Sequence, residues 1–133
     1  FKATILDVFF EKPLKGGVVT LEGEYKMFDA DLSAAALADP ACFCLFDGES
    51  YFVTAAYLFP LGSKHLQPYI RYTSNEPDFI GMEDSDLVEI GVNYVIKSHN
   101  LRFNFNTTDG DANLTGTPGA DVQSFSLGVQ VQI

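Results

Sequence analysis

The chain has few basic residues, few histidines and cysteines, and no tryptophan. Its 133 residues include eight Lys and Arg against 18 Asp and Glu, so the formal net charge is −10. Nucleic-acid phosphates require a basic footprint, so we expect no nucleic-acid partner. Two His and two Cys do not form a zinc framework, which needs about four ligands at suitable spacing.

The sequence also lacks long apolar runs and catalytic motifs. No stretch approaches the roughly 18 apolar residues that a transmembrane helix needs, so we expect no such helix. It contains neither a nucleophile elbow nor a His-Glu-x-x-His motif, and His65 and His99 fall in predicted turns. We therefore expect no enzymatic activity and no cofactor.

Strict alternation of apolar and polar residues is the main positive signal. The last stretch, Val122–Ile133, places Phe125, Leu127, Val129 and Val131 on one face and Ser and Gln residues on the other. Side chains of a strand point to opposite faces with period two. This stretch is therefore predicted to be a strand with one apolar and one polar, uncharged face.

The same pattern recurs along the chain and predicts seven strands. Their expected ranges are Ala3–Glu11, Val18–Met27, Tyr51–Phe59, His65–Thr73, Leu87–Lys97, Leu101–Thr108 and Val122–Ile133. The connections alternate between short and long, and the long connection 28–49 is expected to hold a helix at Asp31–Ala38. We predict an all-β fold, an antiparallel up-and-down meander in one unit spanning residues 1–133.

The predicted apolar faces meet either a protein core or lipid. A soluble β-sandwich binding module would also alternate. However, the predicted apolar faces carry no charged residue, tyrosines lie near several strand ends, and the short turns are basic. Strands of about eight to twelve residues and loops of alternating length are typical of outer-membrane barrels. We therefore predict part of a transmembrane β-barrel in contact with outer-membrane lipid.

Seven strands alone do not satisfy this prediction, because an open sheet leaves unpaired edges in lipid. Either an eighth strand lies within residues 31–46, or the chain is the C-terminal part of a larger barrel. We expect the second, because Phe1 begins almost inside a strand.

Several segments together resemble the phosphate-selective porin O/P family. They are GVVTLEGEY (17–25), FDGESYFVTAAYLFP (46–60), LQPYIRYT (66–73), EIGVNYVIKSHNLRFNFN (89–106) and DVQSFSLGVQVQI (121–133). The resemblance implies a sixteen-stranded, homotrimeric porin of the bacterial outer membrane. Ile133 replaces the aromatic residue usual at the end of such barrels. The family's phosphate selectivity rests on basic ladders, which this chain lacks, so phosphate specificity is not expected.

The polar faces are the candidate channel wall. Side chains expected to set any selectivity there are Glu22, Glu24, Lys26, Arg71, Glu89, Lys97, Arg102 and Asn104. Other inward positions include Asp7, Glu11, Gln67, Tyr69, Asn93, Asn106 and Gln130. Facing carboxylates and basic groups set a transverse field and hence an ion preference. The predicted function is passive diffusion of small hydrophilic or ionic solutes; the alternative is a non-conducting barrel serving as scaffold for another envelope protein.

One segment has part of a calcium-loop spacing. Asp109, Asp111 and Asn113 follow the Asp-x-Asp-x-Asn pattern, but the glycine and the distal glutamate of such a loop are missing. At most a weak Ca²⁺ site in an extracellular loop is expected, and no other metal site.

Overall fold

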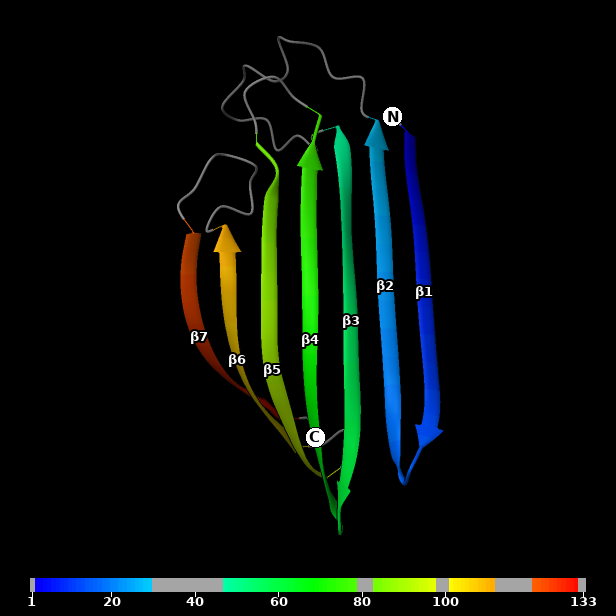
Figure 1. Cartoon of the computed structure of the whole chain (residues 1–133), viewed down its shortest axis with the longest axis vertical. Coiled ribbons are helices and arrows are strands. Elements are labelled where there is room, and N and C mark those ends of the chain that lie inside the picture. The colour runs from blue at the N-terminus through cyan, green and yellow to red at the C-terminus, as the bar shows by residue number, and fades with distance from the viewer. Residues whose placement is uncertain (1, 30–46, 79–82, 98–100, 112–120, 132–133) are drawn as a thin grey trace.

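The computed structural model describes residues 2–29, 47–78, 83–97, 101–111 and 121–131 (Figure 1). These residues form one seven-stranded sheet in the order β1-β2-β3-β4-β5-β6-β7. The strands are β1 (Lys2–Leu14), β2 (Gly17–Asp29), β3 (Gly48–Leu61), β4 (Lys64–Pro77), β5 (Ser85–Lys97), β6 (Leu101–Asp111) and β7 (Asp121–Val131).

Every strand pairs antiparallel with the next one along the chain, so the predicted all-β up-and-down meander is confirmed. Residues 15–16, 62–63 and 98–100 connect strands at one end of the sheet, here called the short-turn end. The strand ends that the longer connections join, Asp29 and Gly48, Pro77 and Ser85, and Asp111 and Asp121, are at the opposite, long-loop end (Figure 1). The predicted helix at Asp31–Ala38 and the candidate strand within 31–46 lie outside the described residues.

The strands contain 11 to 14 residues, and β1 to β6 are longer than the sequence predicts. The ladder continues to the turns, with Leu14 opposite Gly17 and Leu61 opposite Lys64. Positive φ angles at Lys15 and Gly16 allow the chain to reverse within two residues. Pro13 lies one residue before the end of β1, opposite Val18, where a missing N–H leaves the rest of the ladder with β2 intact.

The described residues have no buried apolar core. Their buried side chains are Thr54, Ser74 and Ser85, whereas large apolar side chains are exposed, Leu127 by 76% and Phe125 by 73%. No second layer packs on the sheet within the described residues. These residues also include no helix long and apolar enough to cross a membrane.

Candidate functional site

The register of the sheet joins the apolar sides of all seven strands into one surface. In its middle row, Leu21 is opposite Ala55, Ala55 opposite Ile70, and Ile70 opposite Ile90. We call this surface the apolar face. Its central positions include Leu6, Val8, Phe10, Val19, Leu21, Val53, Ala55, Ile70, Val88, Ile90, Val92, Phe105, Leu127 and Val129.

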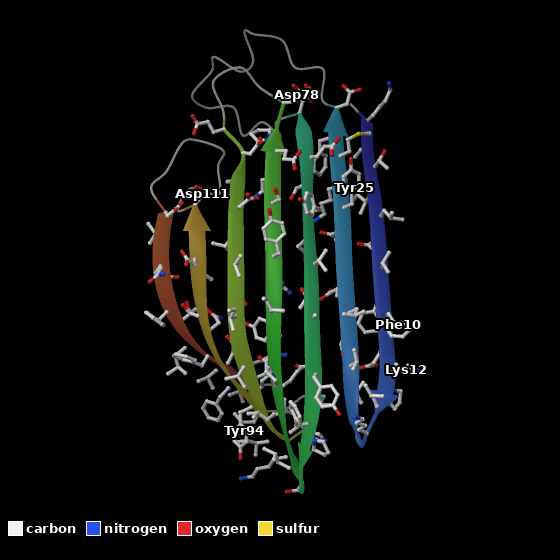
Figure 2. All side chains as sticks on the ribbon, in the orientation of Figure 1. Phe10, Lys12, Tyr25, Asp78, Tyr94 and Asp111 are labelled. Carbon is white, nitrogen blue, oxygen red and sulfur yellow. The ribbon has the colours of Figure 1, made fainter. Side chains whose placement is uncertain are left out.

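Tyrosines border the apolar face at both ends, and their hydroxyls point away from its middle. Near the long-loop end, Tyr72 donates a hydrogen bond to Asp86 Oδ1 at 2.7 Å, and its ring centroid lies 6.1 Å from that of Tyr51. Near the short-turn end, Tyr57 donates to the carbonyl oxygen of Leu14 at 2.6 Å. The hydroxyls of Tyr72 and Tyr57 thus bind groups toward opposite ends of the sheet, and Figure 2 shows two further tyrosines, Tyr25 and Tyr94, toward opposite ends.

Charged residues appear on the apolar face only where the strands extend beyond their predicted limits. Its long-loop end carries the acidic residues Asp29, Glu49, Glu76, Asp86, Asp109, Asp111 and Asp121, together with Lys2, which forms an ion pair with Asp29. At the short-turn end are Lys12 and Lys64, and the Lys64 ammonium lies 5.7 Å from the Tyr94 ring centroid. The uncharged part of the face is thus a band between two charged margins.

The opposite surface is the polar face, and it holds most of the predicted wall residues. The register brings Glu22, Thr54, Arg71 and Glu89 into one row across β2 to β5. Glu24, Lys26, Arg102 and Asn104 occupy the same face on β2 and β6. The ladder shifts between Val95 and Lys97, and the predicted inward orientation of Lys97 lies outside the described side chains.

The acidic sector of the polar face lies on β1 and β2. Asp7 is opposite Glu24, and Glu22 and Lys26 flank Glu24 along the strand. The Lys26 ammonium lies 2.5 Å from Glu24 Oε1. Both side chains are partly exposed, so this pair contributes little to stability. The other carboxylates of this sector are Asp7, Glu11 and Glu22.

Arg71 and Glu89 are direct cross-strand partners but bind other groups. Arg71 Nε donates to Thr54 Oγ1 at 2.9 Å, and its guanidinium carbon lies 5.1 Å from the Phe52 ring centroid. Glu89 Oε1 instead accepts the Tyr69 hydroxyl at 2.5 Å. A hydroxyl and an aromatic ring hold the guanidinium in place, and Arg71 lines the hollow described below.

Side-chain amides form a chain across β4, β5 and β6. Asn106 donates to Asn104, Asn104 donates to Asn93, and Asn93 donates to Gln67, at 2.8, 2.9 and 3.2 Å. Asn104 Nδ2 also lies 3.1 Å from the Tyr69 hydroxyl, which accepts its hydrogen bond. The result is a continuous, uncharged hydrogen-bonding surface beside Arg71 and Glu89.

Tyr69 lies across the neighbouring strand because its partner is glycine. Gly91 is directly opposite Tyr69, and a Cβ added at Gly91 would come within 2.5 Å of the tyrosine Cζ. The ring therefore needs the space that glycine leaves. Alternation predicts that Tyr69 faces inward, but it assigns no role to Gly91 or Thr54; the cross-strand pairing that reveals their roles is not visible in one sequence.

These side chains line a hollow on the polar face. Its lining residues are Thr20, Glu22, Thr54, Ala56, Gln67, Tyr69, Arg71, Glu89, Asn93, Arg102 and Asn104. The predicted residues Glu22, Arg71, Glu89, Arg102 and Asn104 are thus brought together, whereas Glu24 and Lys26 lie farther along β2.

The residues of the predicted calcium site do not form a loop where they are described. Asp109 and Asp111 lie in β6, where Asp109 accepts from Gln123 Nε2 and Asp111 from the backbone N–H of Asp86. Asn113 lies outside the described residues. Within the described ranges no group of three or more His, Cys, Asp and Glu is placed to hold a metal. The weak Ca²⁺ site stays a prediction.

No protein-family model, curated protein or solved structure matches this chain.

Proposed function

We propose that the chain is part of an outer-membrane β-barrel porin, in which the apolar face meets lipid and the polar face lines a water-filled channel for small hydrophilic or ionic solutes. One observation carries this proposal: the apolar face is exposed across the whole sheet, while the polar side chains bond to one another on the other face. A soluble sheet would cover its apolar face with a second layer.

Strand length and the positions of the tyrosines support a membrane orientation. Strands of 13 residues are about 43 Å long at about 3.3 Å per residue. A tilt of about 45° reduces this to about 30 Å, the thickness of a bilayer's hydrocarbon core. Tyr51 and Tyr57 lie toward opposite ends of β3 on the apolar face, and aromatic girdles of such barrels lie at both interfaces.

Closure of the barrel requires further strands. The strands β1 and β7 each pair on one side only within the described residues, and the six antiparallel steps between them, an even number, make them point the same way. Antiparallel closure therefore needs an odd number of added strands between them, and lipid tolerates no open edge. The nine strands missing from a sixteen-stranded barrel would meet this condition. The homotrimer and the bacterial outer membrane belong to the same proposal.

Single-channel recording of the full-length protein tests this function. Detergent-extracted protein added to a planar lipid bilayer in KCl should give stable conductance steps. Under a KCl gradient, Glu22→Gln and Glu24→Gln should shift the reversal potential toward anion preference, because each removes a negative charge from the channel wall. Glu49→Gln is the control, because it removes the same charge at the margin of the apolar face.

Two results would contradict the proposal. A folded barrel without conductance would favour the non-conducting scaffold for another envelope protein. A protein that is soluble and monomeric without detergent would favour the β-sandwich binding module and would overturn the membrane orientation.

A further inference from the structure

We propose that the hollow on the polar face is a binding station for neutral saccharides, built on the ring of Tyr69 as its platform. This inference rests on the proposed channel function and specifies the class of solute that the wall retains. It is drawn from three features of the hollow: an immobilised aromatic ring, amides with free hydrogen-bonding capacity, and balanced charge.

The first feature is the fixed ring of Tyr69. One side of the ring covers Gly91, and the ring also lines the hollow. Its hydroxyl is held twice, donating to Glu89 and accepting from Asn104. A pyranose ring has an apolar face of C–H groups, which stacks favourably on the electron-rich face of an aromatic side chain. A ring already held in place loses little conformational entropy when a sugar stacks on it.

The second feature is the run of amides beside this platform. The chain from Asn106 through Asn104 and Asn93 ends at Gln67, which accepts through Oε1. Among the described residues nothing accepts from Gln67 Nε2, so its two N–H groups remain available in the lining of the hollow. Sugar hydroxyls both donate and accept, and side-chain amides can satisfy both requirements.

The third feature is the charge of the hollow. It is lined by two carboxylates, Glu22 and Glu89, and two guanidinium groups, Arg71 and Arg102, so their charges cancel. An anion at the ring would be repelled by Glu89, and a cation by Arg71. A neutral solute with many hydroxyls meets neither repulsion and can bond to both kinds of charged group.

The test uses maltotriose as probe on the full-length protein in a planar bilayer. Added to the KCl solution, maltotriose should reduce the current saturably, whereas polyethylene glycol of similar hydrodynamic size should reduce it only in proportion to concentration. Tyr69→Leu should raise the half-blocking concentration at least about fivefold, since about 1 kcal/mol of stacking is lost. Tyr69→Phe keeps the platform and should retain most of the block.

Tyr57→Leu is the matched control, because Tyr57 also covers a glycine but on the apolar face. It should leave the block unchanged. Equal block by both probes, or an unchanged half-blocking concentration in a conducting Tyr69→Leu protein, would overturn the saccharide station and leave the channel intact. If wild-type protein gives no KCl steps, the channel proposal fails, and calorimetric titration of the detergent-solubilised protein with maltotriose decides the station separately: heat lost in Tyr69→Leu supports it, and no heat in wild type overturns it.

Discussion

The two faces of the sheet use the same local structure in different surroundings. On the apolar face the ring of Tyr57 covers Gly17, and on the polar face the ring of Tyr69 covers Gly91. Tyr57 sends its hydroxyl to the backbone carbonyl of Leu14 at the short-turn end. Tyr69 sends its hydroxyl to a carboxylate and an amide in the middle of the wall.

The comparison shows that the same arrangement, a tyrosine ring over a glycine, occurs on both faces. The residues around each ring determine which groups the tyrosine contacts. Beside Tyr57 lies another aromatic ring, Phe59, with the two centroids 4.4 Å apart. Beside Tyr69 lie Asn93, Asn104 and Glu89. The Tyr57 ring lies near the short-turn end of the apolar face, whereas the Tyr69 ring is part of the polar face.

The largest expected effect comes from placing a charge in the middle of the apolar face. Leu21→Arg puts a guanidinium in the middle row and should destabilise the protein by about 2–4 kcal/mol, the cost of Arg at the bilayer midplane. Urea unfolding in lipid vesicles measures this free energy. The neighbour Thr20→Arg is the control: it faces the polar side and should cost less than about 1 kcal/mol. Equal losses would show that both faces meet water.

Replacing each of the two glycines by alanine should affect stability differently in the Tyr57–Gly17 pair and in the Tyr69–Gly91 pair. At Gly17 the added Cβ would lie 2.4 Å from the backbone oxygen of Leu58, so the strand itself must shift. Gly17→Ala should therefore cost about 1–3 kcal/mol. At Gly91 the closest atoms belong to the Tyr69 ring, which can swing away, so Gly91→Ala should cost less.

The readouts for this pair are the free energy of unfolding and the maltotriose block. Gly91→Ala should weaken the block while the protein stays folded, because the ring leaves its platform position. Gly17→Ala protein that folds should block normally. A normal block in Gly91→Ala together with a weakened block in Gly17→Ala would mean that the position of the Tyr69 ring does not depend on the space above Gly91.

Removing each hydroxyl should give the smallest effects. Tyr69→Phe deprives a partly buried carboxylate of its donor and should cost about 1 kcal/mol. Tyr57→Phe frees an exposed carbonyl, which water or a lipid headgroup can satisfy, and should cost less than about 0.5 kcal/mol. Thermal unfolding in detergent compares the two. A larger loss of stability for Tyr57→Phe than for Tyr69→Phe would show that water and lipid headgroups do not reach the Leu14 carbonyl at the short-turn end.

The strand count, the antiparallel order and the side of each predicted wall residue except Lys97 follow from the sequence. Alternation in a run such as Phe125-Ser126-Leu127 assigns each side chain to one face of the sheet, because a one-residue slip would move every apolar side chain of the strand to the polar face. Strand ends were less predictable. Pro13 indicates a break in the strand, yet the ladder with β2 continues through Pro13 to Leu14, next to the turn.

The hydrogen-bond partners of the side chains on the polar face could not be predicted from the sequence. Arg71 and Glu89 have opposite charges and face each other across β4 and β5, which favours an ion pair from sequence and register. Arg71 instead binds Thr54 and Glu89 binds Tyr69. Each side chain had several partners within reach on neighbouring strands, and packing over Gly91 brought the tyrosine hydroxyl to Glu89.

The sequence by itself determined a sheet with one apolar and one polar face, because period-two alternation leaves a strand no other arrangement of its side chains. It also determined the two ends, through the alternating lengths of its connections. Only the tertiary structure decided which polar groups meet. Register brings together residues about 20 positions apart, such as Tyr69 and Gly91. The space at this glycine allows the Tyr69 ring to lie across β5, among the hydrogen-bonding side chains of the polar face.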